Sequence, residues 1–289
     1  MPRKSPEPLE SAPLAYQNQE FLSSPDGRVF RLLAEYQEPM TRFRRERIQD
    51  TVVFFGSARF RALDVASHEL ELLENTGSCK PAPADEQPAR KDEVERGEAS
   101  AQQLKLAAAA VEMARYYEDA RTLAGMLSRW AMTLPGRRHR YVITSGGGPG
   151  IMEAANRGAF ELGAMSIGLN IRLPLEQQPN CYITPELCFQ FRYFAIRKFH
   201  FVLRAMALVA FPGGFGTFEE LFEVLTLRQT GRMQHIPINL FGREYWQRAF
   251  DFQFLADEGT IGDADLELFR FVDTAEEAWT VIRKFHRLV

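Results

Sequence analysis

The residues best suited to chemistry lie in one stretch of the chain, residues 205–231. An apolar run from Ala207 to Phe211 predicts a buried strand, which is followed by the turn Pro212-Gly213-Gly214-Phe215-Gly216-Thr217 and a helical pattern from Phe218 onward. A helix start offers unpaired N–H groups and a positive dipole end, and glycines let the backbone approach a phosphate closely. Glu219 and Glu220 come next, so an anion site and a carboxylate lie side by side.

The composition of the chain limits the classes of protein to which it can belong. The chain has 289 residues, of which 45% are hydrophobic and 25% charged, as in ordinary globular proteins. The net charge of −3 argues against a nucleic-acid partner. We find no signal-peptide pattern and no run of ~18 apolar residues that would span a membrane. The cysteines, an odd number without metal-ligand spacing, favour a reduced, cytoplasmic setting and predict no metal site (Cys79, Cys181 and Cys188).

Strand and helix patterns alternate along the chain. Apolar runs predict strands at 51–55, 141–144, 165–171, 207–211, 236–240 and 266–272. Helical patterns lie between them, at 28–47, 62–75, 102–132, 151–162, 185–204, from 218 onward, 245–255 and 275–285. This order predicts one α/β domain over residues 28–289, with a doubly wound, mostly parallel Rossmann-like sheet and helices on both faces.

Three segments stand out from this pattern. Residues 1–27 are rich in Pro, Ser and Glu, which predicts a mostly disordered arm. Residues 76–100 have no apolar period and predict an exposed insertion, within a less regular region at about 62–110. The predicted helix at 185–204 carries phenylalanines on more than one side, which indicates a central helix or a subunit interface.

Glycine-rich turns follow two different strands, which predicts a ligand in the crevice at the carboxyl ends of the strands. A dinucleotide site needs an acid at the end of the strand after Gly146–Gly150, but that strand ends at Asn170-Ile171-Arg172. No GxxxxGK[ST] motif for a nucleoside triphosphate occurs. Pyridoxal chemistry needs a Schiff-base lysine, and Lys198 alone lies near the glycine turns. A monophosphate on the Pro212–Thr217 turn remains.

Here the sequence resembles the LONELY GUY family of nucleoside 5′-monophosphate phosphoribohydrolases, often mislabelled as lysine decarboxylases. The family signature PGGxGTxxE stands complete from Pro212 to Glu220, and the family's Arg-Lys pair stands as Arg197-Lys198. The turn SGGGPGIMEAAN (145–156) and the turn GSAR (56–59) are also similar. The resemblance runs from residue 51 to the C-terminus without 62–110, and the extra segments are typical of larger bacterial-type members.

The resemblance implies hydrolysis of an N-glycosidic bond, giving free base and ribose 5-phosphate, with no metal or other cofactor. The implied substrate is a cytokinin riboside monophosphate or an AMP-like purine or pyrimidine monophosphate. Glu220 would stabilise the oxocarbenium-like transition state and orient water, and Arg197 would hold the nucleotide. The implied substrate-binding residues are Lys198, Gly213, Gly214, Gly216, Thr217, Thr226, Gly147 and Gly148. The family also implies at least a homodimer through the helix that carries Arg197.

Structural interpretations of the same residues stay open. Thr217 and Glu220 have the spacing of a helix capping box, S/T-x-x-E. Arg197 can be a surface charge, and the hydroxyl of Thr226 can bond back to its own helix. The alternative function is a non-catalytic carrier that binds a phosphorylated cofactor such as molybdenum cofactor on the same glycine turns. A single-strand DNA-binding module of related topology is disfavoured by the acidic net charge.

Overall fold

The fold is organised on a parallel sheet. The computed structural model describes residues 11–77, 91–173 and 178–286, with only the backbone at 76–77 and 91–100. Seven strands of this described part form one sheet in the order β4-β3-β2-β1-β5-β6-β7, and every neighbouring pair is parallel. The strands are β1 (Thr51–Phe55), β2 (Val142–Ser145), β3 (Ser166–Ile171), β4 (Cys188–Phe191), β5 (Ala205–Ala210), β6 (Ile238–Phe241) and β7 (Arg270–Val272).

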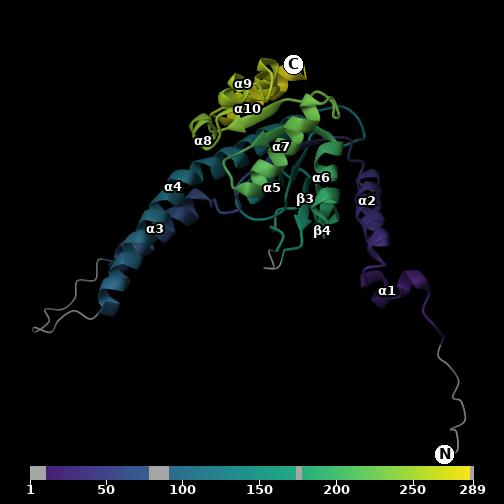
Figure 1. The fold of residues 1–289 in the computed structure, drawn as a ribbon, viewed down its shortest axis with the longest axis horizontal. Helices are drawn as coiled ribbons and strands as arrows, with labels where there is room; N and C mark the ends of the chain where they lie inside the picture. The colour runs from purple at the N-terminus through teal and green to yellow at the C-terminus, as the bar shows by residue number, and fades with distance from the viewer. Residues whose placement is uncertain (1–10, 78–90, 174–177, 287–289) are drawn as a thin grey trace, which may run out of the picture.

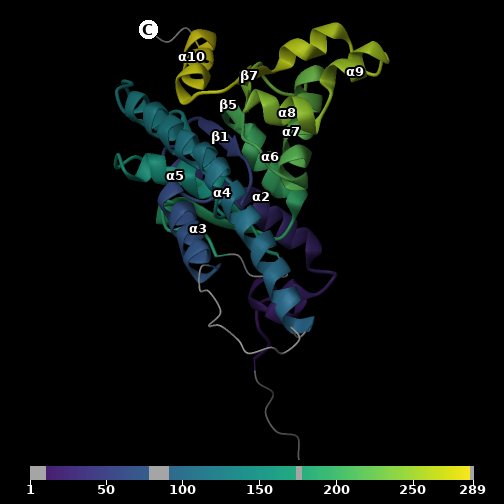
Figure 2. The same ribbon diagram turned by 90° about the vertical axis from the view of Figure 1, so that its left-hand side faces the viewer.

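Helices cover both faces of this sheet (Figures 1 and 2). The chain builds outward from β1 through β2 and β3 to β4, then returns beside β1 and builds outward through β5 to β7. The predicted doubly wound α/β fold is therefore confirmed. The helices are α1 (Gln19–Ser23), α2 (Arg28–Arg45), α3 (Leu63–Gly77), α4 (Lys91–Ala131), α5 (Ile151–Phe160), α6 (Phe194–Leu203), α7 (Phe215–Gln229), α8 (Arg243–Ala249), α9 (Phe252–Asp257) and α10 (Ala275–Phe285).

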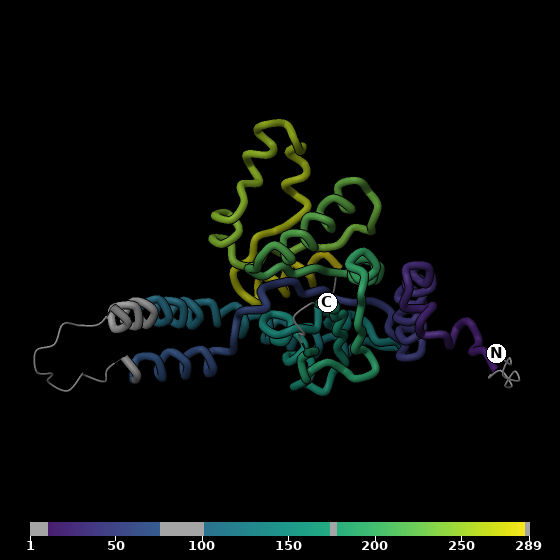
Figure 3. Tube along the Cα trace, turned by 60° about the horizontal axis from the view of Figure 1, so that its bottom comes forward, coloured from purple at the N-terminus to yellow at the C-terminus, as the bar shows by residue number. Residues whose placement is uncertain are grey.

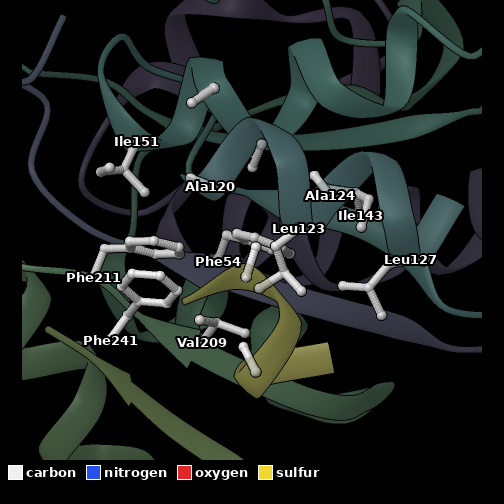
Figure 4. Packing of buried hydrophobic residues seen from close by; sticks show 14 of the residues in the cluster. Phe54, Ala120, Leu123, Ala124, Leu127, Ile143, Ile151, Val209, Phe211 and Phe241 are labelled. Atoms are coloured by element: carbon white, nitrogen blue, oxygen red, sulfur yellow. The ribbon is translucent and has the colours of Figure 1, made fainter. Parts of the chain in front are cut away.

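Alternating side chains of β1 divide the core into two layers. Val52 and Phe54 join the cluster under α4, α5 and α10, whereas Val53 and Phe55 join the cluster under α2, α6, α7 and α8. Figure 4 shows the first cluster, where the rings of Phe211 and Phe241 stack with their centroids 4.4 Å apart. A central strand buried on both faces explains why its sequence, TVVFF, is apolar after Thr51.

The region predicted as an exposed insertion is partly helical. α3 and α4 form a hairpin that projects from the sheet (Figures 1 and 3), and α4 already begins at Lys91. Its sheet-proximal half buries Ala120, Leu123 and Leu127, while the part before residue 101 continues the same helix. That part, KDEVERGEAS, contains three glutamates, which favour helix, but no apolar stripe, so periodicity alone missed it. Residues 78–90 of the insertion lie outside the described residues.

The predicted helix at 185–204 is wrong in its first half. Pro185–Leu187 forms a 3-10 turn, β4 follows, and the helix begins only at Phe194. Phe189 and Phe191 are buried on either side of an exposed Gln190, which is the period of a strand. The phenylalanines therefore do not surround a single helix.

Two other boundaries differ, and part of the N-terminal arm is structured. The helix predicted at 245–255 is divided into α8 and α9, and the last strand covers only Arg270–Val272, after a 3-10 helix at Asp263–Leu268. In the arm, Ala15–Gln17 and Gln19–Ser23 form short helical segments. The ring of Phe21 packs 5.7 Å from that of Phe30 on α2. Residues 1–10 of the arm lie outside the described residues.

No helix of the described residues is long and apolar enough to cross a membrane.

Candidate active site

A cleft of about 1140 Å³ opens at the carboxyl ends of the central strands. The turns that follow β1, β2 and β5 all line it, together with the end of β3 and the start of α7. In doubly wound folds the crevice beside the point where strand order reverses is the usual ligand site, and β1 with β5 forms that point here. The crevice predicted from the two glycine turns therefore exists.

The turn between β5 and α7 is built to hold an anion. α7 begins at Phe215, with Gly214 as its N-cap and no side chain capping it. The backbone N–H groups of Phe215, Gly216 and Thr217 donate to no acceptor among the described residues, and the first turn of α7 contains no acid. All three residues line the cleft. Unpaired donors at the positive end of a helix dipole suit a phosphate group.

The glycines of this turn have two different tasks. A Cβ on Gly213 would lie 2.2 Å from Thr217 Oγ1, so this position must be glycine for the buried threonine to fit. A Cβ on Gly214 or Gly216 would meet nothing within 4 Å, because both face open space in the cleft. The turn is held by its neighbours, since Tyr245 donates its hydroxyl hydrogen to the Gly213 carbonyl and Ser57 N–H donates to the Pro212 carbonyl at 3.0 Å.

Arg197 and Glu220 form an ion pair in the wall of the cleft. Arg197 Nη1 lies 3.2 Å from Glu220 Oε1, and the two side chains are only 9% and 12% exposed. Arg197 Nε also donates to the Leu169 carbonyl at 2.7 Å, and its guanidinium lies 5.0 Å from the centre of the Phe201 ring. The structure thus brings together, beside the anion site, the two residues that the family resemblance implied to be catalytic.

Burial changes the acidity of this pair. Removal from water raises the pKa of Glu220 to about 7, although the charge of Arg197 opposes the shift. Burial likewise lowers the pKa of Arg197, with Glu220 opposing. A carboxyl group that exchanges its proton near neutral pH is suited to general acid–base chemistry.

The capping-box interpretation of Thr217 and Glu220 is wrong. A capping box requires its threonine at the N-cap, but Thr217 is already the third residue of α7. The glycines allow helical geometry to begin at Phe215, three residues earlier than the box needs. Glu220 is therefore oriented by Arg197 and not by the helix terminus.

The glycine turn after β2 is mainly a packing device. Gly147 has a φ of +75°, and a Cβ there would lie 2.4 Å from Asn170 Oδ1. Asn180 Nδ2 donates to the carbonyls of Gly147 and Gly148 at 3.1 and 3.0 Å. Gly148 lines the cleft, whereas Gly147 lies behind it. The first N–H group of α5, that of Ile151, donates to the Ser57 carbonyl at 3.0 Å, so the protein itself occupies this helix start.

Lys198 and Thr226 do not line the cleft in this chain. Lys198 pairs with Glu219 and, at 3.0 Å, with Glu223 on the outer side of α7. Thr226 is exposed, and its hydroxyl donates to the Phe222 carbonyl at 2.8 Å, the back-bond considered for it above. Their roles in substrate binding stay predictions.

The structure adds cleft residues that the sequence did not indicate. Asn170 lies near the end of β3, beside the turn that follows β2. At this position the sequence showed only that the acid of a dinucleotide site is missing. On the far side of the β5 turn an apolar wall is formed by Phe60, Met113, Phe222, Tyr245 and Phe250. These residues come from four separate segments of the chain, and no local sequence motif predicts that they lie together.

The two kinds of glycine predict opposite results for alanine. We expect Gly213→Ala to lower the free energy of unfolding by about 1–3 kcal/mol, because its Cβ overlaps Thr217. The matched control Gly214→Ala, whose Cβ meets nothing, should stay within about 0.5 kcal/mol of the parent chain. Urea unfolding measures both, and equal stabilities for the two variants would contradict this account of the turn.

Comparison with known proteins gives consistent results. The family model described as "Possible lysine decarboxylase" matches residues 152–282. A rice protein, the probable cytokinin riboside 5′-monophosphate phosphoribohydrolase LOGL3 of Oryza sativa subsp. japonica, is 26% identical over 153 residues, which are 50% of this chain and 68% of that protein.

Two solved structures share weaker likeness. The molybdenum cofactor binding protein from the phototrophic bacterium Rippkaea orientalis is 18% identical with a TM-score of 0.40, over 59% of this chain and 88% of that one. The structural-genomics target TM1055 is 16% identical with a TM-score of 0.43, over 81% of this chain and 99% of that one. Likeness at this level carries no argument about function. The family match and the rice relative agree with the complete PGGxGTxxE signature and support the resemblance of this chain to the LONELY GUY family.

Proposed function

We propose that the protein hydrolyses the N-glycosidic bond of a nucleoside 5′-monophosphate and releases free base and ribose 5-phosphate. The observation that carries this proposal is the nearly buried Arg197–Glu220 pair beside the free N–H groups of α7. The name of the rice relative, a probable phosphoribohydrolase of a cytokinin riboside monophosphate, supports the same reaction class. A cytokinin riboside monophosphate and AMP-like purine or pyrimidine monophosphates are the substrates we propose.

The phosphate of the substrate would lie on the β5–α7 turn. The amides of Gly214, Gly216 and Thr217 supply donors there, and Gly213 lets Thr217 pack beneath them. Glu220 follows Thr217 by nearly one helical turn, so its carboxylate faces the part of the ligand next to the phosphate. In a nucleoside monophosphate that part is the ribose.

The reaction needs one carboxylate and one water molecule. As the bond between C1′ and the base nitrogen breaks, its electron pair leaves with the base and positive charge develops on the ribose. Glu220 in its ionised form stabilises that charge and accepts a proton from the attacking water, whose hydroxyl bonds to C1′. The departing base gains a proton from solvent, and Glu220 releases the proton that it accepted to solvent, which restores the ionised carboxylate. Arg197 keeps the carboxylate oriented and remains charged throughout.

A non-catalytic carrier of a phosphorylated cofactor would use the same turn but has no need of this pair. Burying two charges is costly unless they are paired, and a carrier gains nothing from a carboxyl group with a raised pKa. The pair therefore favours the enzyme.

Replacing Glu220 tests the proposal directly. We expect Glu220→Gln to lower kcat for AMP or a cytokinin riboside monophosphate by about 10²–10⁴-fold, because the amide cannot accept the proton of water. The matched control Glu219→Gln, next in sequence but 49% exposed and turned toward Lys198, should stay within about threefold. Release of free base and ribose 5-phosphate is the measurement. A folded parent chain that releases neither from any monophosphate would refute the function.

The pKa of Glu220 predicts the pH profile. The catalytic form is the ionised carboxylate, so kcat/KM should rise with pH and level off above an apparent pKa of about 7. The phosphate of the substrate also ionises, near pH 6. The residual activity of Glu220→Gln separates the two effects, because it keeps only the phosphate ionisation. A profile that is flat between pH 6 and 8 in the parent chain would exclude this role for Glu220.

We also propose that the chain forms at least a homodimer. Large apolar side chains of α2 and α6 are half or more exposed in the single chain, namely Val29, Phe30, Leu33 and Phe194. Contiguous exposed apolar side chains are typical of subunit interfaces. Light scattering after size exclusion should give a mass of two or more chains, and a single-chain mass at micromolar concentration would contradict the proposal.

A further inference from the structure

The cleft contains one polar side chain that the proposed reaction does not use. Asn170, the penultimate residue of β3, is only 5% exposed and lines the cleft. Its Nδ2 donates to the Phe189 carbonyl at 3.1 Å. Its Oδ1 accepts no hydrogen bond from any residue that the structure describes. This oxygen is not fully buried, so it can accept a hydrogen bond from a ligand in the cleft.

The orientation of this amide is fixed. Turning it over would place Oδ1 against the Phe189 carbonyl, so that two acceptors would face each other. The remaining neighbours of Nδ2, the Gly168 carbonyl at 3.5 Å and Cys188 Sγ at 3.6 Å, are acceptors as well. Asn170 therefore presents an acceptor, and not a donor, beside Gly147, whose missing Cβ leaves room for it.

The topology places Asn170 at the far end of a bound nucleotide. Asn170 ends β3 and the phosphate turn follows β5, with β2 and β1 between them, which separates the two sites by roughly 14 Å at the usual strand spacing. Arg197 lies between the two sites, because it contacts Glu220 on α7 and the carbonyl of Leu169, the residue before Asn170. With the phosphate on the turn and the ribose over Glu220, the base extends toward Asn170.

We infer that Asn170 Oδ1 accepts a hydrogen bond from the exocyclic amino group of the base, so that the enzyme selects amino-substituted bases over their keto counterparts. This inference rests on the proposed function. Adenine and cytosine carry an amino group where hypoxanthine and uracil carry a carbonyl oxygen, and that oxygen would face Oδ1 without a proton between them. A base with one alkyl group on its exocyclic nitrogen keeps one N–H and remains a substrate.

The test compares matched nucleotides that differ only in this group. We expect kcat/KM to be about 10- to 100-fold higher for AMP than for IMP, and likewise higher for CMP than for UMP. This ratio corresponds to one hydrogen bond that is made with the amino base and replaced by an unpaired acceptor with the keto base. Asn170→Ala should bring both ratios to within about threefold, mainly through loss on AMP and CMP. Asn239→Ala, a buried asparagine of β6 outside the cleft lining, is the control for destabilisation and should leave both ratios unchanged.

Binding measurements keep this inference separable from the proposed function. Calorimetric titration of the Glu220→Gln variant with AMP and IMP repeats the comparison without turnover. If the parent chain hydrolyses no monophosphate but AMP binds at least tenfold more tightly than IMP, the reaction is wrong and the Asn170 contact stands. Equal rates and equal affinities for AMP and IMP overturn the contact and leave the hydrolase intact. An Asn170→Ala variant that loses discrimination only against 2′-deoxy-AMP also overturns it, because Asn170 then contacts the ribose.

Discussion

The rest of the site depends on one nearly buried ion pair, Arg197 with Glu220. Two charges taken out of water are stable only when each has a partner, so the pair requires α6 and α7 to lie in this mutual position. The Leu169 carbonyl accepts the remaining hydrogen bond of Arg197 Nε and links the pair to the end of β3. Desolvation is not fully compensated, because the pKa of Glu220 still rises to about 7. The incomplete compensation provides a carboxylate that can exchange a proton at neutral pH.

The anion site complements this pair by a different physical means. It uses backbone N–H groups at the uncapped start of α7, which carry no net charge and need no counter-ion. Glycine provides the space, since Gly214 and Gly216 leave the approach open, and Gly213 allows Thr217 to fill the interior. A cationic side chain at the same place would compete with Arg197 for Glu220. The separation of backbone donors from the charged pair keeps both functional.

Sequence reasoning was most successful where a requirement is local. The signature from Pro212 to Glu220 identified the turn, the carboxylate and the family, because spacing along one helix start determines all three. It failed where two local interpretations compete. The strand β4 lies in a long aromatic segment shortly before α6, so the two were predicted as one helix. The start of α4 has helix-forming residues but no apolar period. The S/T-x-x-E spacing suggested a capping box, yet the glycines had already started the helix.

Contacts between segments that are far apart in the chain could not be predicted from the sequence. Nothing near residue 170 shows that its amide nitrogen is committed to the Phe189 carbonyl on β4, a strand that the pattern did not predict. The apolar wall around Tyr245 likewise joins segments far apart in the chain. These walls lie on either side of the β1–β5 centre, and Tyr245 of the apolar wall also holds the anion turn through the Gly213 carbonyl. The end of β3 and the helix α8 therefore line the cleft and also support its centre, because Leu169 accepts a hydrogen bond from Arg197 and Tyr245 donates one to Gly213.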